Sequence, residues 1–126
     1  MSAQRQATMI KIYHNKQCSK SCAALDFLQE HTIDLQVQEY LEEVPSKAEL
    51  IEILSQLGLQ PLALIRKNEA LFLEKFQQLQ LTDEEWVEVM LQNPILIERP
   101  IVIKDGKAVI GRPLERVIDL FSPRSS

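Results

Sequence analysis

Cysteine and histidine are scarce in this sequence, and their scarcity excludes several kinds of site. The 126 residues include two cysteines and two histidines, too few for a disulfide scaffold and without the ligand spacing of a zinc site. We therefore expect no bound metal. Two cysteines without an export signal also predict a cytoplasmic protein, because thiols stay reduced there.

Long hydrophobic runs and an excess of positive charge are missing as well. No apolar stretch approaches the roughly 18 residues that a membrane-spanning helix needs, and residues 1–8 lack the apolar centre of a signal peptide. The formal net charge of −4 does not favour nucleic acid or an acidic membrane. We expect neither partner, a monomeric protein, and flexible tails at residues 1–8 and 123–126.

The first third of the chain alternates between strand and helix patterns. Residues 9–14 and 33–40 alternate apolar with polar side chains, as strands do, and residues 19–30 carry apolar side chains at helical spacing. A strand, a helix and a strand in this order predict a right-handed βαβ unit with a parallel pair of strands.

The middle of the chain is a helical block. Residues 45–58 begin with a capping box of Ser46 and Glu49 and end at Gly58. Further helices are predicted at 61–65, 69–79 and 82–92, the last capped by Thr82 with Glu85.

The end of the chain returns to strands and one helix. Residues 101–110 predict a hairpin whose Asp105-Gly106 pair suits a type I′ turn, and residues 113–121 predict a helix. The order β-α-β, helical block, β-β-α resembles a thioredoxin-like domain that carries a helical insert. We therefore predict one α/β domain over residues 9–122, with the insert at about 45–93.

Cys18 stands where the first strand gives way to the first helix. Unpaired backbone N–H groups and the helix dipole favour negative charge there. Such a position lowers the pKa of a thiol from about 8.5 and makes a nucleophilic thiolate. Lys16 and Lys20 add positive charge nearby. The alternative interpretation is a small apolar residue buried at a helix start.

Cys22 follows Cys18 by one helical turn. This spacing places the two Cα atoms about 6 Å apart, within the range of a disulfide. Side chains on a regular helix run parallel, however, so a bridge would be strained and easily reduced. Cys22 is therefore either a resolving thiol for Cys18 or a small residue that faces the core.

Three arginines stand at junctions between predicted elements. Arg66 ends an apolar helix, Arg99 precedes Pro100 and the third strand, and Arg112 follows the hairpin. A guanidinium bonds two oxygens at once and stays charged, which suits a tetrahedral oxyanion. Each arginine alone is more often a surface residue. Together with a thiol at a helix start, the three predict an oxyanion site.

Four segments carry a resemblance to a known family. The segments "IYHNKQCSKS", "LIRKN", "MLQNPILIERPIVI" and "IGRP" together resemble the glutaredoxin-coupled arsenate reductases, and the match runs from about Met9 to Phe121. The "NPILIERPIV" portion is the most specific. The resemblance implies reduction of arsenate to arsenite, with no bound cofactor, glutathione as co-substrate and glutaredoxin as partner.

The resemblance also implies roles for individual residues. Cys18 would attack arsenate or a similar oxyanion, and the oxyanion would be held by Arg66, Arg99 and Arg112. The residues that tune the thiol or form its loop would be His14, Asn15, Ser19, Ser21 and Pro100, with His14 tuning the thiol and Pro100 preceded by a cis peptide bond.

Cys22 departs from the family pattern, which commonly has arginine at this position. A second thiol so near could resolve oxidised Cys18 internally, and the change removes one positive charge from the anion site. Two alternatives stay open. One is a glutathione-dependent thiol oxidoreductase without arsenate activity. The other is a regulator of the Spx type that binds RNA polymerase, although such proteins usually carry C-x-x-C, whereas this chain has C-x-x-x-C and keeps Arg112.

Overall fold

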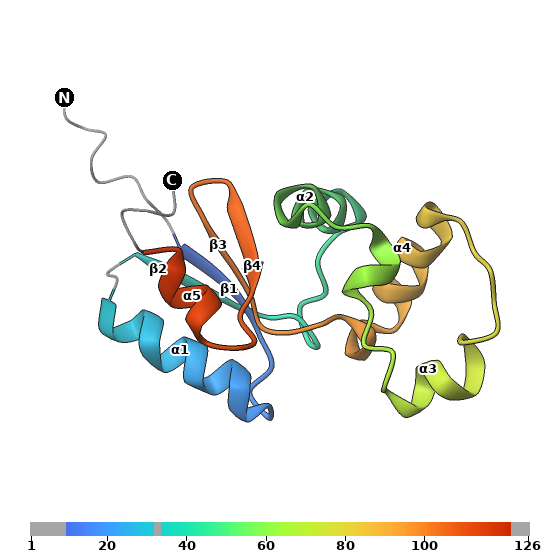
Figure 1. Ribbon diagram of the computed structural model, residues 1–126, viewed down its shortest axis with the longest axis horizontal. Coiled ribbons are helices and arrows are strands. Elements are labelled where there is room, and N and C mark those ends of the chain that lie inside the picture. Colours follow the sequence, from blue (N-terminus) through green and yellow to red (C-terminus); the bar gives the residue numbers. More distant parts are fainter. Residues whose placement is uncertain (1–9, 32–33, 122–126) are drawn as a thin grey trace. The chain divides into compact units, whose positions relative to one another are not determined.

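The computed structural model describes residues 10–31 and 34–121, so the predicted tails at 1–8 and 123–126 lie outside the described residues. The chain divides into two compact units. One unit contains the described residues up to Glu39 together with those from Arg99 onward, and the other is Tyr40–Glu98 (Figure 1). The insert predicted at about 45–93 falls inside the second unit, which begins and ends somewhat further out.

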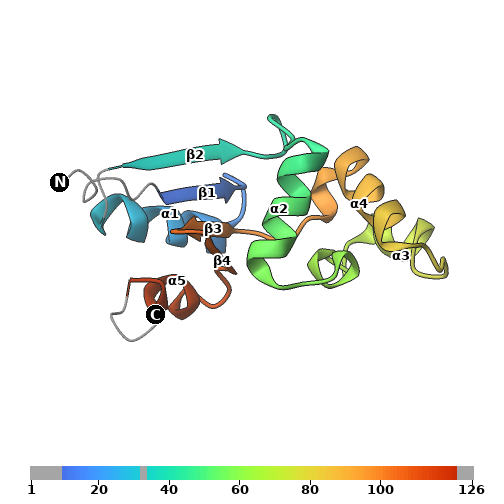
Figure 2. The ribbon, with the colours of Figure 1, turned by 90° about the horizontal axis from the view of Figure 1, so that it is seen from above.

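The first unit is built on a four-stranded sheet in the order β2-β1-β3-β4 (Figure 2). The strands are β1 (Ile10–His14), β2 (Leu35–Glu39), β3 (Ile101–Lys104) and β4 (Lys107–Ile110). β1 runs parallel to β2 with Ile10 opposite Leu35, while β3 is antiparallel to both β1 and β4. The predicted α/β class, parallel pair and terminal hairpin are confirmed.

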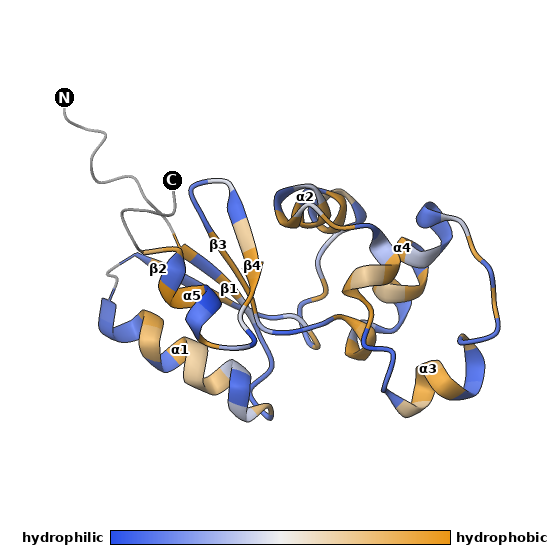
Figure 3. Ribbon diagram, in the orientation of Figure 1, coloured by the Kyte–Doolittle hydropathy of each residue, from blue (hydrophilic) through white to orange (hydrophobic). Residues whose placement is uncertain are grey.

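The hairpin turn has the backbone conformation that its sequence predicts. Asp105 and Gly106 have φ angles of 55° and 77°, and a type I′ turn needs positive φ at both central positions. Figure 3 shows that the turn is hydrophilic. Lys104 Nζ lies 3.3 Å from Oδ2 of the next residue, Asp105, at the start of the turn.

Two helices of the first unit, α1 (Ser19–His31) and α5 (Glu115–Asp119), share one apolar core with the sheet. That core consists of Ile10, Ile12, Ala24, Leu28, Val102 and Val117. Because Ile10 and Ile12 project from the same face of β1, both helices cover that face. α5 is shorter than the predicted helix at 113–121, and its apolar residue Ile118 is 42% exposed. In α1, Ala24 and Leu28 are buried, whereas Ala23 is exposed.

The second unit is helical. It contains α2 (Lys47–Leu57), α3 (Ala70–Lys75) and α4 (Asp83–Gln92), with 3₁₀ turns at Pro61–Leu64 and Pro94–Leu96. Both predicted capping boxes form, Ser46 with Glu49 and Thr82 with Glu85. Gly58 closes α2 in the left-handed conformation with φ 70°, which an L side chain rarely adopts.

α3 is shorter than the predicted helix at 69–79. Phe76 is its C-terminal cap, and the chain then forms a separate turn in which the Leu79 N–H donates to the Phe76 carbonyl oxygen at 3.0 Å. Phe72 and Trp86 anchor α3 and α4 to each other through a ring contact with centroids 6.1 Å apart. Across the described ranges, no helix is both long and apolar enough to cross a membrane.

Candidate active site around Cys18

Cys18 lies directly before α1, at the junction that the sequence predicts. Its N–H donates to the Asn15 carbonyl oxygen and its own carbonyl oxygen accepts the Cys22 N–H, both at 3.0 Å. The residue is half-buried, with a free thiol. Cys18 is therefore held by backbone bonds on both sides while its side chain stays outside the regular helix.

Opposing effects act on the Cys18 thiol, and their balance holds its pKa below the usual value. Burial raises the pKa. The backbone N–H groups of Ser21 and Lys20 and the charge and hydrogen bonding of the Arg99 guanidinium lower it. These donors stabilise a thiolate, the form that acts as a nucleophile.

Lys16 and Lys20 do not act on the Cys18 thiol through their side-chain charges, although the sequence predicts that they do. The ammonium group of Lys16 lies 3.5 Å from a carboxylate oxygen of Glu39, so its charge is directed to that carboxylate. Lys20 acts on Cys18 through its backbone N–H. The cation that lowers the pKa of the thiol is Arg99.

His14 contacts Ser21, which in turn supports the thiol. The His14 side chain is buried, and its Nδ1 lies 2.6 Å from Ser21 Oγ, which also accepts the Asn15 N–H at 3.0 Å. Burial lowers the pKa of His14 against the opposing charges of Glu39 and Asp26 and the Ser21 hydrogen bond. A neutral His14 thus fixes the turn whose N–H groups face Cys18.

Asn15 orders the loop that leads into Cys18. Its side-chain oxygen accepts the Gln17 N–H at 3.0 Å, an Asx turn that mimics a backbone turn. Ser19, which follows Cys18, is exposed. Both residues are therefore part of the loop and first helical turn around the sulfur.

Arg99 carries charged donors that other described residues do not satisfy. Its Nε and Nη1 are buried and have no hydrogen-bond partner among residues 10–31 and 34–121. A buried donor left unpaired costs about 1–3 kcal/mol. The guanidinium that faces the Cys18 sulfur therefore retains the capacity to bind an anion.

Pro100 and Gly111 pack against each other behind Arg99. The Arg99–Pro100 peptide bond is cis, as the resemblance implies, and the Gly111 N–H donates to the Pro100 carbonyl oxygen at 2.8 Å. A Cβ at position 111 would lie 2.7 Å from Val117 Cγ2 and 3.1 Å from Pro100 Cγ. Only glycine fits there without displacing its neighbours, a requirement that the sequence analysis missed.

Arg112 stands on the loop between β4 and α5 and is exposed. A hollow of about 290 Å³ lies beside this loop, and it is lined by Ser19, Lys20, Ala23, Gly111, Pro113 and Leu114. The first turn of α1 thus forms one wall and the loop that carries Arg112 forms the other. Sequence patterns gave no signal for this hollow, because its walls come from distant segments.

Arg66 belongs to the second unit. Its Nη1 lies 2.8 Å from Glu69 Oε2 and donates to the Ile95 carbonyl oxygen at 3.4 Å. It does not end an apolar helix as predicted, because the 3₁₀ turn ends at Leu64 and Ile65 forms a β-bridge with Ile97. Of the predicted arginines, Arg99 interacts with Cys18. Arg66 has its contacts within the second unit.

Cys22 is half-buried and its thiol is free. Its Sγ donates to the Lys16 carbonyl oxygen at 3.4 Å, so the sulfur is turned back toward the loop before Cys18. The buried residues of α1 are Ser21, Ala24 and Leu28.

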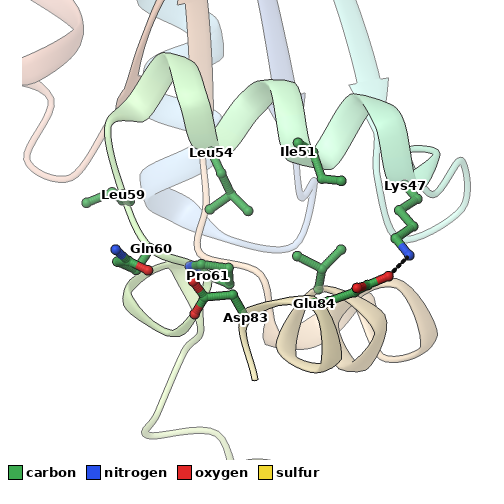
Figure 4. A pocket seen from close by; sticks show the side chains of 9 residues that line it. Lys47, Ile51, Leu54, Leu59, Gln60, Pro61, Asp83 and Glu84 are labelled. Atoms are coloured by element: carbon green, nitrogen blue, oxygen red, sulfur yellow. Dashed lines mark hydrogen bonds and ion pairs between the residues drawn. The ribbon is translucent and has the colours of Figure 1, made fainter. Parts of the chain in front are cut away.

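Two further features of the described residues bear on the choice of site. No three His, Cys, Asp or Glu side chains within the described ranges gather as a metal site would require. The second unit has a hollow of about 520 Å³, with apolar walls that include Ile51 and Leu54 and an ion pair of 2.9 Å between Lys47 and Glu84 at its rim (Figure 4). Neither cysteine nor histidine is among the residues that line it.

Comparisons with known proteins place these features in a family. The ArsC family model matches residues 13–120. The uncharacterized protein YfgD of Escherichia coli K12 is 41% identical over 113 residues, 88% of this chain and 95% of that protein. An arsenate reductase of Neisseria meningitidis is 40% identical over 110 residues, 86% of this chain and 94% of that protein.

A solved structure supports the same relationship. The structure of an arsenate reductase from Vibrio cholerae is 42% identical, with a TM-score of 0.85, and the match covers 91% of this chain and 99% of that one. Together with the sheet order, it confirms the predicted thioredoxin-like fold. The similarity spans nearly the full length of each protein, so it is not confined to a shared fragment.

Proposed function

The chain belongs to the ArsC family, and we propose that it reduces arsenate to arsenite with Cys18 as the nucleophile. Arg99 is the observation that supports this proposal most directly. Its guanidinium lowers the pKa of the Cys18 thiol and also carries two buried nitrogens without hydrogen-bond partners among the described residues. A tetrahedral oxyanion bound there would satisfy those donors beside the reactive sulfur.

The reaction needs such a cation for an electrostatic reason. Arsenate and a thiolate are both anions, and two unit charges about 4 Å apart repel by about 4 kcal/mol at an effective dielectric constant of 20. Arg99 offsets this repulsion and stabilises charge as an oxygen leaves. We propose that Arg112 joins Arg99 in holding the oxyanion.

Cys18 then forms a covalent adduct. Its thiolate attacks arsenic, a sulfur–arsenic bond forms, and one arsenic-bound oxygen leaves as water after protonation. Glutathione is the external source of the electrons that reduce the adduct to arsenite, and glutaredoxin removes the disulfide that remains on the protein. The hollow between Ser19 and Leu114 is our proposed site of approach for glutathione, with Lys20 facing one of its carboxylates.

A coupled assay tests this function. Arsenate-dependent NADPH consumption is measured in the presence of glutathione, glutaredoxin and glutathione reductase, with wild-type protein and Cys18→Ser. We expect turnover with wild type and none with the variant. Equal turnover by Cys18→Ser would refute the nucleophile. Reduction of a glutathione mixed disulfide with no reduction of arsenate would instead favour the glutathione-dependent thiol oxidoreductase.

A further inference from the structure

We infer that Cys22 is the resolving thiol of the reaction, which attacks Cys18 in the arsenic adduct and forms an internal disulfide before glutathione takes part. This inference rests on the proposed function and assigns one of its steps to a residue of this chain. Glutathione and glutaredoxin then act on the Cys18–Cys22 disulfide.

The orientation of the Cys22 side chain favours this role. Side chains of an α-helix tilt toward its N-terminus, and Cys22 Sγ reaches back to the carbonyl oxygen of Lys16 at 3.4 Å. Lys16 precedes Cys18 in the chain, so the sulfur of Cys22 lies at the level of the loop that holds the nucleophile. It is not part of the apolar core that Ala24 and Leu28 form under the helix.

The position of Cys18 at the N-terminal end of the helix weakens the geometric objection to a bridge. On a regular helix, Cβ atoms four residues apart are about 5–6 Å from each other, whereas a disulfide needs about 3.5–4.5 Å. The two Cβ atoms must therefore approach each other by roughly 1–2 Å for a bridge to form. Cys18 precedes α1, so its side chain does not have to run parallel to that of Cys22.

Such a bridge suits a catalytic cycle better than a structural role. Closing the gap strains the first turn of α1, and strained disulfides are more easily reduced. Both cysteines are half-buried, so an external thiol can reach the bridge. The disulfide would then form during turnover and be reduced again by a dithiol or by glutathione.

The electrons and atoms balance in two steps. In the adduct, the Cys22 thiol loses its proton to solvent and its sulfur attacks Cys18 Sγ. The sulfur–sulfur bond forms, the sulfur–arsenic bond breaks, and arsenic keeps the electron pair. Arsenic(V) is thereby reduced to arsenite, and the two thiols are oxidised to one disulfide.

A single-turnover experiment tests the inference. Reduced protein is mixed with arsenate without any other thiol, and free arsenite and remaining thiols are measured. We expect wild type to release close to one equivalent of arsenite and to lose both thiols, whereas Cys22→Ser releases none until glutathione and glutaredoxin are added. The double variant Cys22→Ser/Gln29→Cys keeps the thiol count but moves one thiol to an exposed site two turns further along α1, and it should behave like Cys22→Ser.

A second measurement needs no arsenate. One equivalent of Ellman's reagent forms a mixed disulfide on Cys18, and attack by Cys22 then expels a second nitrothiobenzoate. We expect about two equivalents of released chromophore from wild type and one from Cys22→Ser. If wild type releases only one and keeps one titratable thiol, the resolving role is wrong. If such a wild-type protein still reduces arsenate with glutathione, the proposed function is correct and only the resolving role of Cys22 is wrong. If Ellman's reagent reports the bridge but arsenate is never reduced, the proposed function fails, and with it the role of Cys22 in arsenate reduction.

Discussion

Replacing Arg99 separates the chemistry proposed for this site from a structural role. The informative set is Arg99→Ala, Arg99→Lys and a control, Arg116→Ala, which removes an exposed guanidinium from α5 of the same unit. Alanine removes both the charge and the donors. Lysine keeps the charge but cannot present a planar fork to two oxygens.

The expected loss follows from the contacts of Arg99. It acts on Cys18 through charge and hydrogen bonding, and its buried Nε and Nη1 have no partners in the described part of the chain. Loss of one group that stabilises a transition-state anion costs about 2.7–4 kcal/mol, or roughly 10²–10³ in kcat/KM. Arg99→Lys should fall between alanine and wild type. The pKa of the Cys18 thiol should rise in Arg99→Ala.

The free energy of unfolding should not fall with kcat/KM in Arg99→Ala. Buried donors that lack partners oppose folding, so Arg99→Ala should leave the free energy of unfolding unchanged or raise it. A residue that served only the fold would lower that free energy when truncated. Loss of activity together with preserved stability would therefore assign Arg99 to the anion site.

Three measurements on the same proteins give these quantities. Iodoacetamide alkylation against pH reports the thiolate fraction of Cys18, with Cys22→Ser as background so that one thiol reacts. The coupled arsenate assay gives kcat/KM, and urea unfolding gives stability. The reasoning would be refuted if Arg99→Ala matched wild type and Arg116→Ala in both the alkylation profile and kcat/KM.

Other substitutions probe the support of the site and its pH dependence. Ser21→Ala removes the hydroxyl bonded to buried His14 at 2.6 Å and should lower the free energy of unfolding in urea by roughly 1–3 kcal/mol; an unchanged value would contradict a structural role for this hydroxyl. Gly111→Ala places a methyl group 2.7 Å from Val117 Cγ2 and should cost about 1–3 kcal/mol in the same assay, whereas wild-type stability would show that the packing yields. The pKa of Cys18 is lower in the folded protein than in the unfolded chain, so the unfolded chain binds more protons at any pH between these two values. The free energy of unfolding of wild type relative to Cys18→Ser should therefore rise with pH across that window. This extra stability should be lost as the pH falls through the folded-state pKa. Urea titrations at several pH values measure this difference, and a flat profile would contradict a folded-state thiolate.

Local signals in the sequence predicted several elements of both units well. Capping boxes and the Asp105-Gly106 turn depend on residues a few positions apart, and each appears as expected. The placement of Cys18 between a strand and a helix follows from the same short-range patterns. The helix predicted at 113–121 is α5 at Glu115–Asp119, and Ile118 within it is exposed.

Features that depend on packing could not be predicted in the same way. The contact between Gly111 and Val117, the hollow beside Ser19 and the unpartnered donors of Arg99 all join segments far apart in sequence. Lys16 and Arg99 are both basic residues at a loop, yet one pairs with Glu39 and the other reaches the thiol. Which cation serves the site is decided by tertiary neighbours and not by proximity along the chain.

The point at which the chain leaves and re-enters the first unit has an evolutionary consequence. β2 ends at Glu39 opposite His14, and β3 begins at Ile101 opposite Tyr13. The chain therefore leaves and re-enters the first unit at the same end of the sheet, on either side of β1, the strand that leads to Cys18. Strands two apart in a sheet are separated by only about 10 Å. The length of the segment Tyr40–Glu98 can therefore change without altering strand registry, while the loop that holds Cys18 is preserved.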